Sequence, residues 1–401
     1  KANVQVSSHL ESYSRSRFDE RDTNSRIMNI QACSRSCVLV AAEAPFVKVG
    51  QFKKAPPSAC LLGRSSVVAN RVAHRAKVQL KGLNCTTALK RGSAGARSHS
   101  RGLSSCVASA SDIEALGGSK AELDKVIQVA IAAAKEGGEV ISRKVGADVI
   151  KTKGNPQDLL TEVDGEVQEI LERAVTEAFP AHGFLGEESV PPGPEASIAA
   201  LDKILNDPNS PDWLWIVDPI DGTTNFVQGM PLSAISIGVA YKGEIVAGVI
   251  LDPFRDECFT ATLGGGAFLN GEPIRVGKQA EVGDATVCTG FGATGSSGPM
   301  LRGLTAMAAL PVRTIRMLGS AAVMFSWVAC GRLTCYFEAD LNPWDIAGGA
   351  ILVKEAGGRM SDIDGSEYTL RTRCVMGTNG LTHEPLMAAL QGANVLGLDK
   401  A

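Results

Sequence analysis

The chain has 401 residues and a formal net charge of −3 at pH 7, but its charge is divided unevenly. Residues 1–110 contain 18 Lys and Arg against 5 Asp and Glu, whereas residues 111–401 contain 22 and 38, a net charge of −16. An acidic body argues against nucleic acid as the main partner, and no run of 18 or more apolar residues predicts a membrane span.

The first 110 residues have the composition of a targeting leader. No Asp or Glu occurs between Ala44 and Ala110, while Arg, Lys, Ser and Ala recur, as they do in organellar transit peptides. The alternative is an unrelated disordered tail. We expect an unstructured leader over residues 1–110. Its Ser-rich and weakly amphipathic character favours a chloroplast (plastid stroma) address over a mitochondrial one.

Two helices are predicted at the start of the acidic body. Residues 120–143 carry apolar side chains at helical spacing and predict a long first helix. Thr161 and Asp164 have the spacing of a capping box, and apolar residues recur on one helical face as far as Ala178. Asp164 therefore either only caps the second helix or also orients a hydroxyl group or a water molecule in a site.

Glu187 follows the apolar tripeptide Gly183-Phe184-Leu185, at the point where a short strand would end. Ligands of open α/β sheets commonly bind at the ends of strands. An exposed surface acid is the alternative, and Glu187 alone would not exclude it. Residues 191–212, rich in Pro, Asp, Asn and Ser, indicate a surface insertion after it.

The most informative segment is an apolar run that ends in Asp218 and Asp221 and then turns through Gly222. The two carboxylates and the Ile220 carbonyl can point the same way, and Mg²⁺ prefers such oxygen ligands. The amides of Gly222 and Thr223 can face an anion if a helix begins there. The D-x-x-D-G pattern alone is often only a solvated turn. Together, metal ligands and anion-binding amides predict metal-assisted phosphate chemistry.

The rest of the chain first predicts strands and then an alternation of strands and helices. Residues 234–251 indicate a hairpin around Lys242-Gly243, residues 259–262 continue the sheet, and Gly264-Gly265-Gly266 indicates a turn. Helices are expected at about 318–331 and 345–356. This order predicts an antiparallel sheet layer joined to an α/β layer.

Asp345 lies in the first turn of the last of these helices. Pro343 and the pair Gly357-Gly358 are its start and stop signals. A carboxylate in the first turn is favoured by the helix dipole, so Asp345 either only stabilises the helix or also binds metal.

Histidine and cysteine chemistry is not indicated. Only His182 and His383 occur beyond residue 110, and neither touches a motif, so a histidine-centred acid–base mechanism is not expected. The later cysteines form no C-x-x-C pair and predict neither zinc nor a disulfide framework.

Four ordered motifs resemble those of the inositol monophosphatase family, which are magnesium-dependent, lithium-sensitive phosphatases of small phosphate monoesters. They are T-x-x-D at 161–164, G-E-E-S at 186–189, W-x-V-D-P-I-D-G-T-T-N-F at 215–226 and W-D-x-A-G at 344–348. The resemblance runs from about residue 120 to about residue 390. It implies an α/β (α+β) fold, the five-layer αβαβα sandwich of the inositol monophosphatase/fructose bisphosphatase type, and a homodimer.

The expected phosphatase domain covers residues 111–391. Its antiparallel-sheet half covers about 111–285 and its α/β half about 286–391, and residues 392–401 form a C-terminal tail.

The resemblance also implies a role for each matching residue. Glu187, Asp218 and the Ile220 carbonyl would hold one Mg²⁺, and Asp218, Asp221 and Asp345 a second, with a third, looser ion near Glu187. The expected catalytic residues are Asp164 and Thr223, which would activate the attacking water, together with Glu187. The expected substrate-binding residues are Gly222, Thr223, Asp221, Asp345, Lys153 beside the phosphate, and Glu338 at the sugar-ring hydroxyls.

The predicted activity is hydrolysis of myo-inositol monophosphate by in-line attack of an activated water. The continuation Thr224-Asn225-Phe226 resembles the inositol and sugar phosphate branch, because histidinol-phosphate and nucleotide phosphatases usually have a lysine at position 224. Position 342 is Asn in this chain and His in animal relatives. L-galactose 1-phosphate therefore remains an alternative substrate, as does histidinol phosphate. A relative without catalysis that binds metal or phosphosugar and regulates is the alternative from another class.

Overall fold

The computed structural model describes residues 112–152, 159–291 and 297–396. The predicted leader, Lys153 and the last residues of the predicted tail therefore lie outside the described residues. In the described part of the chain, no helix combines the length and the apolar character needed to cross a bilayer.

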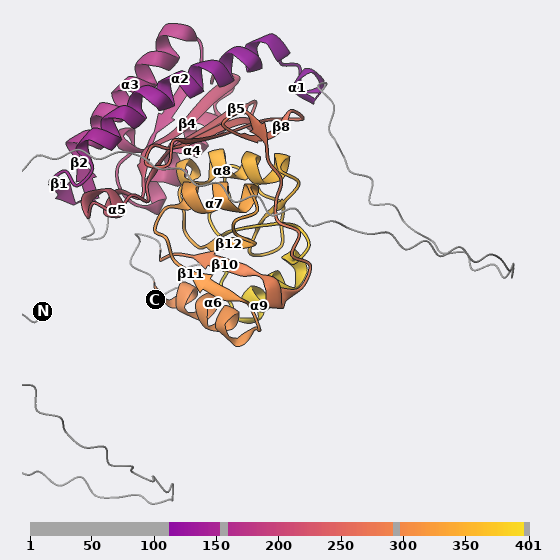
Figure 1. Ribbon diagram of the computed structural model, residues 1–401. Helices are drawn as coiled ribbons and strands as arrows, with labels where there is room; N and C mark the ends of the chain where they lie inside the picture. Colours follow the sequence, from indigo (N-terminus) through magenta and orange to yellow (C-terminus); the bar gives the residue numbers. More distant parts are fainter. Residues whose placement is uncertain (1–111, 153–158, 292–296, 397–401) are drawn as a thin grey trace, which may run out of the picture. The chain divides into compact units, whose positions relative to one another are not determined.

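Two long helices cover one face of the larger sheet (Figure 1). After the short α1 (Asp112–Ala115) come α2 (Lys120–Lys144) and, beyond a two-stranded pairing of β1 (Val149–Thr152) with β2 (Leu159–Thr161), α3 (Glu162–Ala178). Ser119 caps α2 through the Glu122 amide, and the predicted capping box of Thr161 and Asp164 is present at α3. Both helices confirm the ranges that the apolar spacing predicts.

The larger sheet has seven strands in the order β3-β4-β5-β6-β7-β8-β9. β3 runs parallel to β4, and the other pairs are antiparallel. All residues of β4 and β5 are buried, as expected for strands that are covered on both faces. The strands are β3 (Gly183–Gly186), β4 (Trp213–Asp221), β5 (Ala234–Tyr241), β6 (Glu244–Asp252), β7 (Glu257–Thr262), β8 (Gly266–Leu269) and β9 (Glu272–Pro273).

Helices α7 (Ala321–Ala329) and α8 (Pro343–Glu355) form the middle layer, against the other face of this sheet. Glycines let α8 approach the strands closely. A Cβ at Gly248 would lie 2.6 Å from the carbonyl oxygen of Gly348, and a Cβ at Gly238 would lie 2.5 Å from Cβ of Ala347. The backbone of α8 is therefore seated directly on β5 and β6.

The second sheet has five strands in the order β11-β10-β12-β14-β13. α7 and α8 pack on one of its faces, and α6 (Ser297–Ala309) and α9 (His383–Gly392) cover the other through a separate apolar cluster. Figure 1 shows the resulting αβαβα order of layers, which confirms the expected fold class. The strands are β10 (Thr286–Thr289), β11 (Thr314–Arg316), β12 (Cys335–Glu338), β13 (Arg359–Asp362) and β14 (Val375–Thr378).

The structure contains helices that were not predicted from the sequence, among them α1 and α9. The expected surface insertion over 191–212 contains a helix, α4 (Pro194–Asn206), which the sequence analysis did not predict. Helix α6 was also not predicted. The five described cysteines are all free, and Cys330 and Cys335 contact different apolar clusters.

Candidate active site

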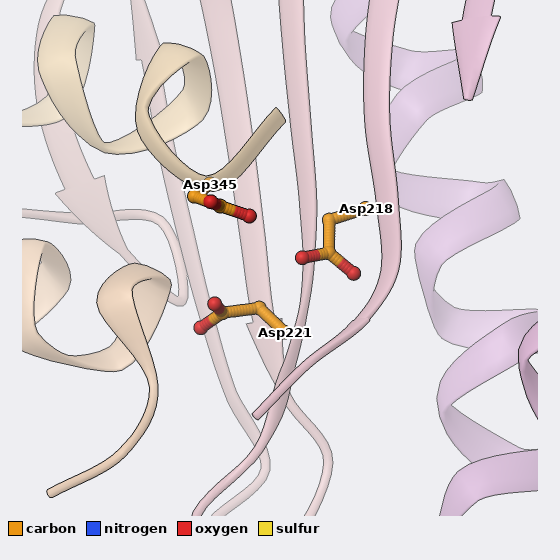
Figure 2. Close-up of side chains that lie close together, drawn as sticks. All are labelled: Asp218, Asp221 and Asp345. Atoms are coloured by element: carbon orange, nitrogen blue, oxygen red, sulfur yellow. The ribbon is translucent and has the colours of Figure 1, made fainter. Parts of the chain in front are cut away.

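Asp218 and Asp221 stand near the end of β4. Side chains three positions apart on a regular strand point to opposite faces, but the pairing of β4 with β5 shifts register between these two residues. Pro219 lies in the shifted part, where a residue without an N–H is tolerated. The Ile220 amide donates to Asp218 Oδ1 at 2.9 Å. Because of this irregularity, the carboxylates of Asp218 and Asp221 lie close together, as Figure 2 shows.

Asp221 is held from outside its own strand by the start of α7. The amides of Ala321 and Ala322 donate to its two oxygens at 3.2 and 2.8 Å, and the Ser320 hydroxyl also donates to it. Ser320 is at the same time the N-cap of α7. Ser320 was not predicted as a site residue, although a serine directly before an apolar helical stretch is a typical N-cap.

Asp345 comes from the first turn of α8, as predicted. Pro343 opens the helix, and the Asn342 amide donates to Asp345 Oδ2 at 2.7 Å. One oxygen each of Asp218, Asp221 and Asp345 lies within 4.8 Å of the others. A strand end and a helix start therefore bring three carboxylates to one point.

Glu187 joins this group from the neighbouring strand. It opens the short turn Glu187–Ser189 directly after β3 and lines the same cavity as the three aspartates. Because β3 and β4 are parallel neighbours, their carboxyl ends meet at one edge of the sheet. The charge of Glu187 contributes to raising the pKa of Asp218.

Burial and mutual repulsion make this cluster unfavourable as a set of bare anions. Burial raises the pKa of Asp218 and of Asp345 well above the usual range, and the charges of neighbouring acids raise both further. Burial also raises the pKa of Asp221 to about 6, although the bonds from Ser320 and the α7 amides oppose this shift. Buried charges require compensation, and a divalent cation with oxygen ligands would supply it.

Glu338 forms another part of the cavity wall, at the end of β12. The Tyr336 hydroxyl donates to Glu338 Oε2 at 2.8 Å. Burial raises the pKa of Glu338 to about 7, while the bond from Tyr336 lowers it. A Cβ at Gly290 would lie 2.2 Å from Glu338 Oε2, so glycine leaves the room that this carboxylate occupies. Neither Tyr336 nor Gly290 was predicted from the sequence.

Most of the predicted site residues line a single cavity of about 200 Å³. Its wall also contains residues that were not predicted for the site, among them Ser320, Tyr336 and Gly290. The predicted residues on the wall are Glu187, Asp218, Ile220, Asp221, Gly222, Thr223, Glu338 and Asp345.

Asp164 and Thr223 occupy neighbouring elements. Asp164 Oδ2 accepts hydrogen bonds from the amide and the hydroxyl of Thr161 at 2.9 and 2.5 Å, and Asp164 is not among the residues that line the cavity. Thr223 does line it, and its Oγ1 donates to the Ile220 carbonyl at 3.0 Å. Helix α5 (Thr223–Val227) contacts β2, which ends at Thr161.

The two described histidines lie elsewhere. His182 stacks between Phe179 and Trp213, and His383 is buried beside Ser361 and Thr378. Neither lines the cavity. The described residues that line the cavity therefore offer mainly carboxylates, hydroxyl groups and backbone amides.

Comparison with known proteins shows what this chain is similar to. A sequence model described as the inositol monophosphatase family matches residues 122–394. Inositol monophosphatase 1 of Solanum lycopersicum is 38% identical over 272 residues, covering 67% of this chain and 96% of the tomato protein.

Two bacterial proteins extend the likeness. The protein named Nus factor SuhB of Pseudomonas aeruginosa is 35% identical over 274 residues, covering 67% of this chain and 97% of its own length. The solved structure of the Thermotoga maritima IMPase is 32% identical with a TM-score of 0.58, covering 68% of this chain and 98% of that one.

Proposed function

The chain belongs to the inositol monophosphatase family and is a phosphatase, and from this premise we propose that it hydrolyses myo-inositol monophosphate with magnesium as its cofactor. One observation carries the proposal. A single cavity joins the acids Glu187, Asp218, Asp221 and Asp345 to the buried carboxylate of Glu338. The first group suits a cation, and Glu338 suits the hydroxyl groups of a polyol.

The proposed ligand sets follow the family resemblance. Glu187, Asp218 and the Ile220 carbonyl would hold one Mg²⁺, and Asp218, Asp221 and Asp345 a second, with a third, looser ion near Glu187. The raised pKa values of Asp218 and Asp345 support this assignment, because burial and like charge leave these acids in need of a cation. When bound, Mg²⁺ neutralises charge on a phosphate ester and lowers the pKa of water.

The remaining roles belong to the residues of the chain. Asp164 and Thr223 form the pair that takes a proton from the attacking water. The amides of Gly222 and Thr223 bind the phosphate, with Lys153 beside it. Gly222 has a φ of 91°, and a Cβ there would lie 3.0 Å from the carbonyl oxygens of both Gly319 and Leu232. A side chain at this position would therefore displace the amides.

Glu338 is the residue that we propose binds the hydroxyl groups of the leaving group. A pKa of about 7 lets its carboxyl group exist in both protonation states near neutral pH, so that it can accept or donate a hydrogen bond. L-galactose 1-phosphate and histidinol phosphate are the alternative substrates. Asn342 lines the cavity at the position that departs from animal relatives, and an altered leaving-group contact there would favour the sugar phosphate.

A regulatory role is the candidate from a different class. One relative that is 35% identical carries the name Nus factor. Loss of one of the acids around the cavity, or of the pair of Asp164 and Thr223, would indicate such a chain. The presence of Glu187, Asp218, Asp221 and Asp345 there supports catalysis instead.

We also propose that the protein is a homodimer and that residues 1–110 direct it to the plastid stroma. Analytical ultracentrifugation tests the first proposal; a single species at the mass of one chain would overturn it. A fusion of residues 1–110 to a fluorescent protein tests the second; mitochondrial or cytosolic fluorescence would overturn it.

The activity is tested by phosphate release from the full-length chain, with and without Mg²⁺ and Li⁺. The substrates are myo-inositol 1-phosphate, L-galactose 1-phosphate, histidinol phosphate and fructose 1,6-bisphosphate. We expect Mg²⁺-dependent and Li⁺-inhibited release with the highest kcat/KM on the inositol ester. A preference for another ester would replace the substrate assignment, and no release from any ester would overturn the proposed catalytic function.

A further inference from the structure

Two arginines before β14, Arg371 and Arg373, connect this segment to helix α4. Arg371 binds the exposed side of the helix: its Nε donates to Asp202 Oδ1 at 2.7 Å and its Nη2 to Asn206 Oδ1 at 3.0 Å. The Arg371 side chain is 51% exposed, so water competes for these contacts.

Arg373 is partly buried and contacts two separate segments. Its side chain is 14% exposed. Nη1 donates to Ser197 Oγ of α4 at 2.8 Å and to Asn342 Oδ1 at 3.3 Å. Nε and Nη2 both donate to Asp340 Oδ1, at 3.0 and 2.8 Å. The planar guanidinium group therefore fixes α4, Asp340 and Asn342 relative to one another.

The loop between β12 and α8 needs this support. Asp340 has a φ of 63°, a left-handed backbone that few residues other than glycine adopt. Its carboxylate is 9% exposed and has Arg373 as its ion-pair partner. The carbonyl of Arg373 also accepts a hydrogen bond from the Leu341 amide at 3.0 Å. Side chain and backbone of one residue thus hold three consecutive positions, 340–342.

These positions determine where Asp345 lies. The Asn342 amide donates to Asp345 Oδ2 at 2.7 Å, so a shift of Asn342 moves a carboxylate of the cavity. On the other side, α4 follows the turn that carries Glu187, with only residues 190–193 between them. Arg373 therefore connects the loop that precedes Asp345 to the helix that follows the turn carrying Glu187.

We propose that Arg373 is a positioning residue for the metal site: it sets the affinity for divalent cations by holding Asp345 through Asp340 and Asn342, and by tying this loop to α4. The inference rests on the proposed function. Partners that orient metal ligands typically change metal affinity about 10-fold to 100-fold when they are removed.

The test is equilibrium binding of Mn²⁺, measured by isothermal titration calorimetry on the full-length chain. Arg373→Gln should raise the dissociation constant by about 10-fold to 100-fold. Arg371→Gln is the matched control, because it removes a neighbouring arginine whose side-chain hydrogen bonds, among the described residues, go to α4, and its Mn²⁺ affinity should match the wild type. Arg373→Lys should recover part of the loss, since lysine restores the charge but not the fork. With Arg373→Gln, saturating Mg²⁺ should also restore most of kcat.

Each outcome decides the proposal. Unchanged Mn²⁺ affinity in a folded Arg373→Gln protein, or an equal loss in Arg371→Gln, would overturn it. If Arg373→Gln does not fold, Asp340→Gly takes its place, because glycine accepts the left-handed backbone and the substitution removes the side chain that pairs with Arg373. Unchanged affinity in that variant would overturn the proposal. A wild type that binds no Mn²⁺ would instead refute the proposed metal site, and this inference with it.

Discussion

The cavity has two walls that are built by different means. The acidic wall, formed by Glu187, Asp218, Asp221 and Asp345, lies at the ends of β3 and β4 and at the start of α8, and backbone amides hold its three aspartates. The Glu338 wall, formed by Glu338, Tyr336 and Gly290, is held by one contact between side chains and by the room that a glycine leaves.

This difference shows which part of the site can change. Backbone amides are part of the main chain, so a substitution of a side chain leaves these hydrogen-bond donors present. A contact between two side chains changes with either residue. We infer that the acidic wall sustains the chemistry common to the family, while the Glu338 wall selects the leaving group. Substitutions in each wall test this separation.

Asp218→Asn should break the acidic wall. Asp218 is the shared ligand in the proposed site, and the neutral amide keeps its shape but removes its charge. We expect kcat to fall by about 10³-fold, the scale of losing a group that stabilises charge in the transition state. Phosphate release from myo-inositol 1-phosphate over a range of Mg²⁺ concentrations is the measurement. Near-normal turnover at saturating Mg²⁺ would contradict the assignment.

Thr223→Ala should separate catalysis from metal binding within the same cavity. Removing the hydroxyl should lower kcat by about 10²-fold, as for loss of a group that handles a proton, with little change in the Mg²⁺ concentration for half-maximal rate. If both quantities fall equally, Thr223 builds the site through its bond to the Ile220 carbonyl and does not activate water.

Glu338→Gln should weaken only the binding of the leaving group's hydroxyl groups. A buried carboxylate that binds ring hydroxyls contributes about 1.5–3 kcal/mol, so kcat/KM for myo-inositol 1-phosphate should fall by about 10-fold to 100-fold. Phenyl phosphate, which has no ring hydroxyls, is the control and should be hydrolysed at the wild-type rate. An equal loss on both esters would mean that the two walls do not act separately.

Gly248→Ala should disturb the packing of α8 against β6 and so lower the stability of the fold that carries the acidic wall. The added methyl group would meet the Gly348 carbonyl oxygen at 2.6 Å, and such overpacking costs about 1–3 kcal/mol. Thermal unfolding should occur at a lower temperature. Gly165→Ala in α3 is the matched control, because nothing lies within 4 Å of its Cβ position, and it should raise Tm slightly. Equal shifts in both variants would contradict this account of the packing.

Local patterns predicted the acidic wall because its geometry is largely local. Asp218, Asp221 and Gly222 lie within five positions, and Asp345 binds the Asn342 amide within one helical turn. Contacts between distant segments were not predictable in this way. Ser320 and Asp221 are 99 residues apart in the chain, and the need for glycine at 290 depends on the position of Glu338.

The fold shows the same limit. Long apolar periodicities predicted α2 and α3, and two strand-like runs around Lys242-Gly243 predicted the hairpin of β5 and β6. Helix α4 was missed because Pro, Asp and Asn surround it, and because only Ser197 and Leu201 along it are buried. The proposed connection of α4 to the metal site depends on the hydrogen bond between Arg373 and Ser197. No pattern in the sequence indicates this contact.

The most direct test of the two-wall account is Mn²⁺ binding at equilibrium to the wild type, Asp218→Asn and Glu338→Gln, each as the full-length chain and without substrate. We predict that Asp218→Asn loses most of the affinity for Mn²⁺, while Glu338→Gln binds it as tightly as the wild type. Equal affinity in all three proteins would contradict a metal site on the acidic wall. An equal loss in both variants would contradict the separation of metal binding from substrate selection.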